Sequence, residues 1–194
     1  MTVADSRTAL CVVDLQNDFA DPGGSLYVTD GEKVVPFANE QIRAARDAGA
    51  LVVYTQDWHP PDTPHFAKDG GVWPVHCVRD TWGAAFHPDL IVDGPIVRKG
   101  TGGEDGYSAF TVADPKSGER SPTELEGILR EHGLTGVILV GLATDYCVVS
   151  SALDAIEAGF ETVALLEGIR AVDLKPGDGD RAIETMRDAG VILR

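Results

Sequence analysis

The sequence predicts a single α/β domain, in which helices cover both faces of a doubly wound, mostly parallel sheet of six strands. Short apolar runs, typical of strands buried on both faces, alternate along the chain with segments whose apolar residues recur at helical spacing. The turns between them are short, as in the successive units that build a parallel sheet. A length of 194 residues suits one such domain, so we expect residues 1–194 to form one three-layer unit.

The first half of the chain begins with a strand, a helix and a second strand. The apolar run 9–13 predicts a buried strand closed by Asp14, and a loop is expected over 21–24. Apolar residues then recur at helical spacing from Val34 to Ala45, with Gly49 as the helix end. The β-rich run 51–54 predicts a strand that ends before Asp57.

A long stretch without periodicity follows the second predicted strand. From Trp58 to Asp89 proline, glycine, histidine and tryptophan accumulate, and neither helical nor strand spacing is maintained. Irregular loops of this length inside a compact domain are usually functional. This stretch is therefore a candidate for binding residues.

The second half returns to alternating strands and helices. Ser121-Pro122-Thr123-Glu124 is a capping box with proline at the first helical position, and it predicts a helix that ends at Gly133. The other expected elements are a weak strand over 95–98, strands over 137–140, 162–166 and 191–193, and helices over 148–156 and 182–189.

Charge and composition exclude several classes of partner. Lys+Arg 16 against Asp+Glu 31 gives 16 − 31 = −15, with a pI near 4.5, so nucleic acid and anionic membrane surfaces would be repelled. The first seven residues are too polar for a secretory signal, and no apolar run approaches the ~20 residues of a membrane span. We expect a cytoplasmic protein, without disulfides among its three distant cysteines.

Three chemically active side chains follow predicted strands. Asp14, Lys99 and Cys147 each come directly after a strand or after the turn that ends it, and ligands in open parallel sheets bind beyond the carboxyl ends of the strands. Taken singly, each has an alternative reading, as a loop-start or capping acid, a surface cation and a small core residue. Together on one sheet edge they favour a shared site.

The residue types suggest nucleophilic catalysis. Cys147 falls in the first turn of a predicted helix, where unpaired backbone N–H groups and the helix dipole favour a thiolate. No histidine lies near Cys147 in sequence, so Asp14 is the candidate base unless a distant histidine folds in. Lys99 would hold that carboxylate and offset the negative charge, and the N–H groups of Ala143 and Cys147 are candidate oxyanion donors.

A second constellation lies in the irregular stretch. Asp57 and His59 face the same way if that segment is extended, as Pro60 favours, and His65 closes the loop. One carboxylate with two or three imidazoles, His76 being a further candidate, suits a divalent first-row metal. The alternative is a set of polar loop histidines bonded to backbone.

Other motifs fail on inspection. His87 and His132 are expected to be structural, the latter at a helix C-terminus where a cation is favoured. The glycine-rich run 100–105 lacks the third glycine of a dinucleotide fingerprint, and no lysine directly follows a glycine as a P-loop requires. Nucleotide binding is therefore not expected.

The chain resembles the isochorismatase-like cysteine hydrolases from Ala9 to the C-terminus. Five motifs carry the resemblance in order: Val13-Asp14-Leu15-Gln16-Asn17-Asp18-Phe19, Gln56-Asp57-Trp58-His59-Pro60, Trp73-Pro74-Val75-His76-Cys77, Arg98-Lys99-Gly100 and Gly141-Leu142-Ala143-Thr144-Asp145-Tyr146-Cys147. Within this family the chain is most similar to members that hydrolyse nicotinamide and pyrazinamide, because other members generally lack the Asp-x-His set.

The resemblance implies a role for each motif. It implies a triad of Asp14, Lys99 and Cys147, and one divalent metal, zinc before iron or manganese, held by Asp57, His59 and His65 with His76 as a further ligand. It places the substrate against Phe19, Trp73, Tyr107 and Tyr146. The Leu142-Ala143 peptide bond corresponds to one that is cis in the family, and Tyr146 and segment 101–106, which carries Glu104 and Asp105, are expected to tune amide preference.

The expected activity is hydrolysis of nicotinamide to nicotinate and ammonia through a cysteine thioester, as a step of NAD salvage. One alternative is a family hydrolase acting on another carboxamide or on an N-carbamoyl substrate. From a different class, the chain would be a non-catalytic metal- or partner-binding domain that kept the scaffold. The expected partner is a small amide, and a homo-oligomer is compatible with the sequence.

Overall fold

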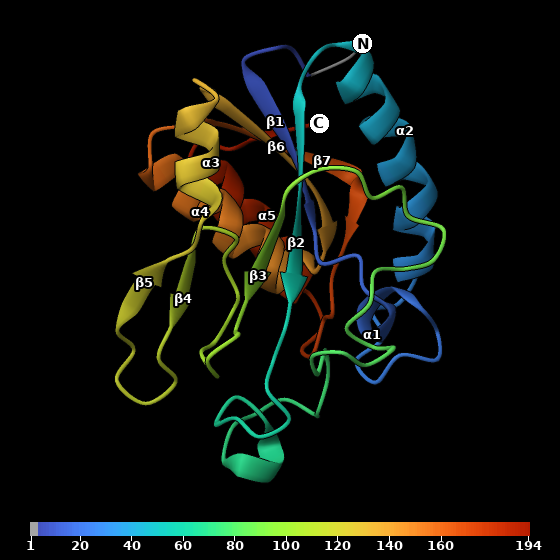
Figure 1. Ribbon diagram of the computed structural model, residues 1–194, viewed down its shortest axis with the longest axis vertical. Helices are drawn as coiled ribbons and strands as arrows, with labels where there is room; N and C mark the ends of the chain where they lie inside the picture. Colours follow the sequence, from blue (N-terminus) through green and yellow to red (C-terminus); the bar gives the residue numbers. More distant parts are fainter. Residues whose placement is uncertain (1–3) are drawn as a thin grey trace.

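The computed structural model describes residues 4–194 and contains one central sheet of six parallel strands. The strands are β1 (Thr8–Val13), β2 (Leu51–Asp57), β3 (Ile96–Lys99), β6 (Gly136–Leu142), β7 (Glu161–Arg170) and β8 (Ile192–Leu193), in the order β3-β2-β1-β6-β7-β8. Every neighbouring pair is parallel (Figure 1). The predicted fold class, a six-stranded doubly wound sheet, is confirmed.

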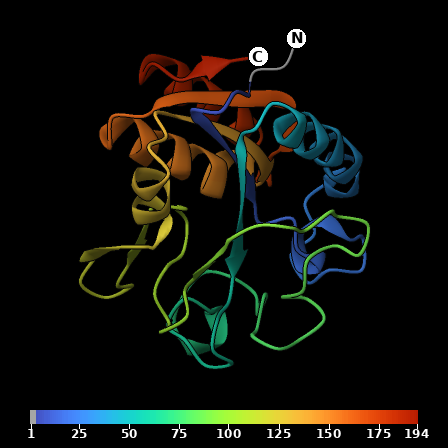
Figure 2. The ribbon, with the colours of Figure 1, turned by 45° about the horizontal axis from the view of Figure 1, so that its top comes forward.

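Helices cover both faces of this sheet (Figures 1 and 2). On one face lies α2 (Val34–Asp47), and on the other lie α3 (Leu125–Glu131), α4 (Val149–Glu157) and α5 (Asp178–Asp188). Successive residues of a strand point to opposite faces, so Leu10 and Val12 of β1 join the core under α2, while Ala9 and Cys11 join the core under α3 to α5. The continuous apolar run of β1 is thus explained by burial on both sides.

The predicted capping box is wrong. Ser121 and Pro122 belong to β5 (Arg120–Pro122), which pairs antiparallel with β4 (Thr111–Ala113) in a small hairpin that the sequence did not predict. The helix begins only at Leu125, and Thr123 Oγ1 accepts from its N–H at 3.2 Å. Strand pairing therefore outweighs the local capping preference of these residues, and Pro122 is compatible with it because proline is tolerated in edge strands.

Other boundaries differ by a few residues. β2 continues through Asp57 and β7 runs to Arg170, so both are longer than predicted. Each continues to pair with its neighbouring strand, β3 or β6, beyond the apolar run. Short elements that carried no periodic signal are α1 (Asn17–Ala20), single turns of 3-10 helix at Gly31–Lys33 and Ala67–Asp69, and a wide π-helical turn at Thr144–Val148 that leads into α4. Within residues 4–194, no helix is long and apolar enough to cross a membrane.

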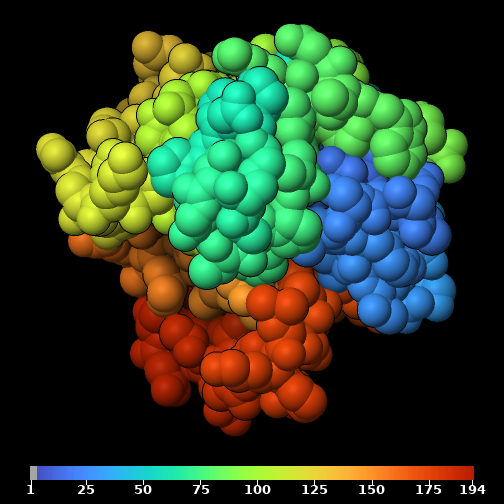
Figure 3. Space-filling model, turned by 90° about the horizontal axis from the view of Figure 1, so that it is seen from below, coloured from blue at the N-terminus to red at the C-terminus, as the bar shows by residue number. Residues whose placement is uncertain are grey.

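The irregular stretch after β2 covers the carboxyl ends of the strands. It is held by isolated bridges, His59 to Val78, Phe66 to Trp73 and Gln16 to Phe86. Seen from below, the part around residues 60–75, in teal and green, lies over the middle of this face, between the N-terminal loops in blue and the residues near 170 in red (Figure 3). The irregular stretch, which was predicted to be functional, therefore covers the sheet edge where Asp14, Lys99 and Cys147 were predicted to meet.

Candidate active site

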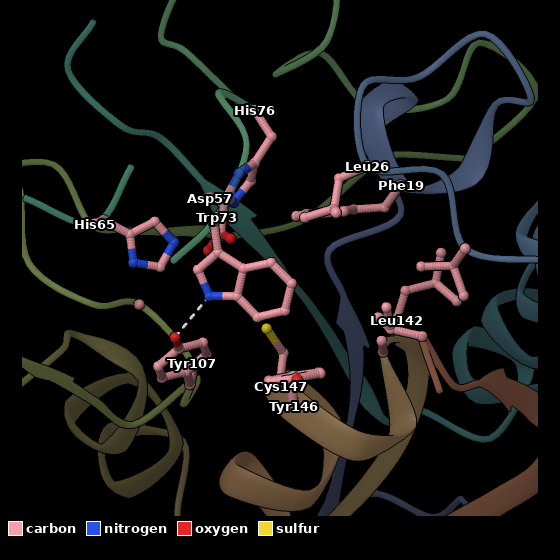
Figure 4. Close-up of a pocket in the computed structure, with 14 residues that line it drawn as sticks. Phe19, Leu26, Asp57, His65, Trp73, His76, Tyr107, Leu142, Tyr146 and Cys147 are labelled. Atoms are coloured by element: carbon pink, nitrogen blue, oxygen red, sulfur yellow. Dashed lines mark hydrogen bonds between the residues drawn. The ribbon is translucent and has the colours of Figure 1, made fainter. Parts of the chain in front are cut away.

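A pocket lies beneath this stretch, at the carboxyl edge of the sheet (Figure 4). It encloses about 420 Å³ of empty space, its open mouth included. The residues that line it are Phe19, Leu26, Val28, Asp57, His65, Trp73, His76, Gly106, Tyr107, Leu142, Ala143, Tyr146, Cys147 and Val172. Apolar and aromatic walls with a few polar groups are typical of a small-molecule site.

The structure brings Asp14, Lys99 and Cys147 together at the base of the pocket, where Cys147 reaches the lining and Asp14 and Lys99 are buried behind it. Asp14 follows the last residue of β1, and Lys99 is the last residue of β3. Lys99 Nζ donates to Asp14 Oδ2 at 2.7 Å and lies 3.7 Å from Cys147 Sγ. Acid, cation and thiol are thus within reach of one another, although 48 and 85 residues of sequence separate Lys99 from the other two.

A hydroxyl fixes the remaining oxygen of the acid. Thr55 Oγ1 donates to Asp14 Oδ1 at 2.6 Å and accepts from the Asp14 N–H at 3.2 Å. Asp14 itself adopts a left-handed backbone with φ 48, which costs free energy for a residue other than glycine. The Thr55 hydrogen bonds and the left-handed backbone of Asp14 together orient its carboxylate toward Lys99 at the point where β1 ends.

Burial dominates the electrostatics of the thiol and the acid. Burial raises the pKa of the Cys147 thiol well above its usual range, against the opposing effect of Lys99. Burial therefore outweighs the effect of the helix start, and the thiol needs a base, as expected from the sequence. Burial likewise raises the pKa of Asp14, with Lys99 opposing, which brings the acid closer to the range in which a base exchanges protons at neutral pH.

Lys99 remains charged despite its burial. Burial alone lowers the pKa of Lys99, but the carboxylates of Asp14 and Asp57 outweigh it and raise the pKa well above its usual range. Lys99 Nζ lies 2.8 Å from Asp57 Oδ1, outside hydrogen-bond geometry, and donates to the carbonyl of Gly106. Lys99 therefore contacts both Asp14 and Asp57, the acid that was predicted to bind metal.

The turn before Cys147 has the predicted backbone. The peptide bond between Leu142 and Ala143 is cis, as expected. Gly141 has φ +125, and a Cβ at this position would collide with the backbone of Val13, so only glycine fits. Ala143 and Cys147 both line the pocket, and within residues 4–194 the Ala143 N–H donates to no protein acceptor. That N–H is free to serve a ligand.

The histidines of the irregular stretch form one cluster. Ring nitrogens of His59, His65 and His76 all lie within 4.8 Å of one another, and all three residues are buried. Asp57 adjoins the cluster, with its Oδ2 3.8 Å from His59 Nε2, and also groups with Asp14 and Cys147. Asp57 thus lies between the histidines and the triad.

The donor set fits a divalent metal. Both ring nitrogens of His59 are buried and have no partner within the part of the chain described, a state that costs about 1–3 kcal/mol per unpaired polar group. Burial lowers the pKa of His65 and lowers that of His76 to about 4, so both imidazoles are neutral, the form that binds metals. A metal would satisfy one of the two unpaired nitrogens of His59.

Two of the three histidines are already oriented. His65 Nδ1 lies 2.6 Å from Asp105 Oδ1, and His76 Nδ1 lies 2.7 Å from the carbonyl of Pro74. Because both partners only accept, each Nδ1 carries the hydrogen and each Nε2 keeps its lone pair. Metal-binding histidines show this arrangement almost always.

Aromatic side chains close the pocket, including all four predicted to contact substrate. Trp73 Nε1 donates to Tyr107 Oη at 2.8 Å (Figure 4), and the rings of Trp73 and Tyr146 meet edge to face at 4.8 Å. Phe19 lies 5.5 Å from His76, ring centre to ring centre. The sequence did not predict Leu26, Val28, Leu142 or Val172 as lining residues, since ordinary aliphatic residues give no functional signal.

His87 and His132 lie outside this site. His132 Nδ1 bonds to the carbonyl of Ile128 near the end of α3, consistent with the predicted structural role, and His87 Nδ1 accepts from the N–H of Asp89. The three cysteines Cys11, Cys77 and Cys147 are free thiols.

Known proteins share this architecture over most of their length. The isochorismatase domain matches residues 8–194. A nicotinamidase of Escherichia coli (strain K12) is 38% identical, over 95% of this chain and 93% of its own. Among solved structures, a pyrazinamidase of Pyrococcus horikoshii in complex with zinc superposes with a TM-score of 0.86 at 42% identity, covering 97% of this chain and 98% of its own. PnC1 from L. infantum in complex with nicotinate gives a TM-score of 0.88 at 35% identity, covering 100% and 95%.

Proposed function

The chain belongs to the isochorismatase family, and we propose that it is an amidohydrolase that converts nicotinamide and water to nicotinate and ammonia. One observation carries this proposal: a buried acid and lysine contact a cysteine that lines a pocket, and two histidines of the three-histidine cluster line the same pocket. The acid, lysine and cysteine suit attack on a carboxamide. The histidine cluster favours a substrate whose ring carries a donor nitrogen, as a pyridine does.

Formation of the thioester begins with proton transfer. Asp14 takes the proton of Cys147 Sγ, and the thiolate attacks the carboxamide carbon. The N–H groups of Ala143 and Cys147 bind the oxygen that becomes negative. Asp14 then returns its proton to the departing nitrogen, so that ammonia leaves and a thioester remains on Cys147.

Hydrolysis of the thioester reuses the same acid. Asp14 takes a proton from water, the resulting hydroxide attacks the thioester carbon, and the same N–H groups bind the oxyanion. When the carbon–sulfur bond breaks, the thiolate recovers the proton from Asp14, and the nicotinic acid that forms loses its carboxyl proton to solvent and leaves as nicotinate. Lys99 stays protonated throughout and offsets the charge that alternates between Asp14 and Cys147.

The metal is divalent, and we propose that it is zinc, held by Asp57, His59 and His65 with His76 as a further ligand. When bound, it supplies a Lewis-acidic contact that orients the ring of the substrate. Phe19, Trp73, Tyr107 and Tyr146 would confine the ring between aromatic walls, and their positions around the pocket support that role.

The setting of the enzyme is also part of the proposal. We propose that residues 1–194 act as a single domain in the cytoplasm, as part of NAD salvage, with a small amide as partner and without nucleic acid or membrane. The net charge of −15 supports the exclusion of anionic surfaces. A homo-oligomer remains compatible with this setting.

An ammonia assay over a panel of amides tests the proposal. Nicotinamide and pyrazinamide should release ammonia, and prior treatment with a chelator should abolish release until zinc is added back. Release only from N-carbamoyl substrates or aliphatic amides would replace nicotinamide as the substrate. Bound metal without ammonia release from any amide would instead indicate a binding domain that kept the scaffold.

A further inference from the structure

Segment 100–106, which follows Lys99, touches the histidine cluster at three points. Gly100 has φ +70, and a Cβ there would run into the ring of His59. Thr63 Oγ1 donates to the carbonyl of Gly103 at 2.8 Å and accepts from the His65 N–H at 3.2 Å, so this hydroxyl connects Gly103 to His65. Asp105 completes the set through its contact with the His65 ring at 2.6 Å. A segment expected to tune amide preference is thus tied to the metal ligands.

Asp105 is itself held firmly by the backbone. Its N–H donates to the carbonyl of Ala113 at 2.8 Å, and its carbonyl accepts from the Ala113 N–H at 2.9 Å. This two-bond bridge joins Asp105 to the β4–β5 hairpin, so its carboxylate is presented from a fixed position. Asp105 does not line the pocket, and its side chain is 26% exposed. Its hydrogen-bonding contact with the site is the one with His65.

The contact between Asp105 and His65 determines which ring nitrogen of His65 is available to bind a metal. With the hydrogen held on Nδ1 by the carboxylate, Nε2 keeps its lone pair, and the charge of the acid makes that lone pair more basic. Without Asp105, the ring would be free to rotate and to exchange tautomers, and metal binding would have to restrict both.

We propose that Asp105 is a positioning residue for the metal, which by accepting the Nδ1–H of His65 keeps Nε2 of that ring directed at the histidine cluster. The proposal rests on the metal site of the proposed function. It assigns the β4–β5 hairpin a role as well, because this hairpin anchors the positioning acid.

Zinc affinity, measured on metal-free protein by competition with a chromogenic chelator, tests this inference without reference to activity. Asp105→Ala should weaken zinc binding about 10–100-fold, the usual cost of losing such a partner. Asp105→Asn should weaken it less, since an amide oxygen still accepts the bond without the charge. The visible spectrum of the cobalt-loaded protein should change in Asp105→Ala, because the ligand geometry at His65 loosens.

Glu104→Gln is the matched control. Glu104 is the neighbouring acid, but its Oε2 accepts from the N–H of Gly102 at 2.9 Å and contacts no histidine, so zinc affinity and cobalt spectrum should match wild type. The melting temperatures of the metal-free variants should agree with wild type, which separates a change in the site from a loss of folding.

A double-mutant cycle with His65→Ala makes the test specific. If Asp105 acts through His65, adding Asp105→Ala to His65→Ala should cause no further loss of zinc affinity. A further loss on that background, or a wild-type affinity in Asp105→Ala alone, would overturn the inference and leave the proposed function intact. Failure of the wild-type protein to bind zinc or any other divalent metal would overturn the inference together with the metal part of the proposed function.

Discussion

The two halves of the candidate site are built in different ways. Asp14, Lys99 and Cys147 are placed by the sheet: β2 pairs with β3 so that Asp57 lies opposite Lys99, and β1 pairs with β6 so that Val13 lies opposite Gly141. The histidines are placed by a long irregular stretch through individual hydrogen bonds, those of His65 to Asp105 and of His76 to Pro74.

Strand register can place the side chains of the first half, whereas only individual tertiary contacts can place those of the second half. Parallel pairing brings the strand ends to one edge whatever the loops do, so the three reactive groups meet as a consequence of topology. A metal needs its ligands within a few tenths of an ångström, and no regular element of this chain spans the histidines. Variants in the first half should therefore abolish chemistry and spare the metal, and variants in the second half should lose the metal and, with it, substrate binding.

The largest effect is expected for Cys147→Ala. Loss of the nucleophile should lower kcat/KM for nicotinamide at least about 10⁴-fold, as removal of a triad nucleophile does elsewhere. Zinc content, measured by atomic emission, should stay at the wild-type level. Cys11→Ala removes another buried thiol of the same core and should retain activity. Residual ammonia release near the wild-type rate in Cys147→Ala would refute the thioester mechanism.

Asp14→Asn should follow closely. Asparagine keeps the shape and can still bond to Thr55, but it cannot take a proton, so kcat should fall about 10²–10⁴-fold. The measurement is steady-state ammonia release across pH 6 to 9, with zinc content as the check on the other half of the site. Activity retained at high pH, where the thiol ionises without help, would limit the role of Asp14 to the deprotonation of Cys147.

His59→Ala tests the irregular half. Its ring has both nitrogens unpaired, so it is the ligand with least support from the protein and most to gain from metal. Zinc affinity should fall at least about 100-fold, and KM for nicotinamide should rise with it. His132→Ala, an exposed histidine on α3, is the control and should bind zinc as wild type does. An unchanged zinc affinity in His59→Ala would remove this residue from the ligand set.

The smallest effect concerns the thiol before substrate binds. Because burial raises the pKa of Cys147, the free protein should carry little thiolate at neutral pH, and each unit of pKa increase lowers that fraction about tenfold. Alkylation by iodoacetamide, followed by mass spectrometry, should be slow at pH 7 and accelerate above pH 9. Fast alkylation that is already constant at pH 7 would show that the helix start outweighs burial after all.

The sequence predicted the sheet half of the site well because the relevant physics is local. Short apolar runs define strands, and the residues after them lie at the sheet edge, so position and residue type together indicated that Asp14, Lys99 and Cys147 would meet there. The cis bond at Leu142-Ala143 was predicted only through the family resemblance. All six strands of the central sheet were identified, although β2, β6 and β7 extend two or more residues beyond their predicted ends.

Features that depend on distant partners were not predicted. The β4–β5 hairpin was mistaken for a helix cap because Ser121 and Pro122 satisfy the local preference equally well. The rise in the pKa of the Cys147 thiol was not predicted, because burial, which causes it, is not a property of neighbouring residues in the sequence. Asp105 was named only as a neighbour of the pocket, since nothing in its surroundings in sequence indicates the ring of His65, 40 residues earlier.

Strand β6 lies between β1 and β7 in the sheet, but it follows β1, β2 and β3 along the chain. The ribosome therefore makes Asp14, Asp57 and Lys99 before Cys147, which follows β6. A nascent chain that has not reached β6 holds two carboxylates and a cation but no nucleophile. The nucleophile Cys147 is therefore the last of these four residues to be synthesised.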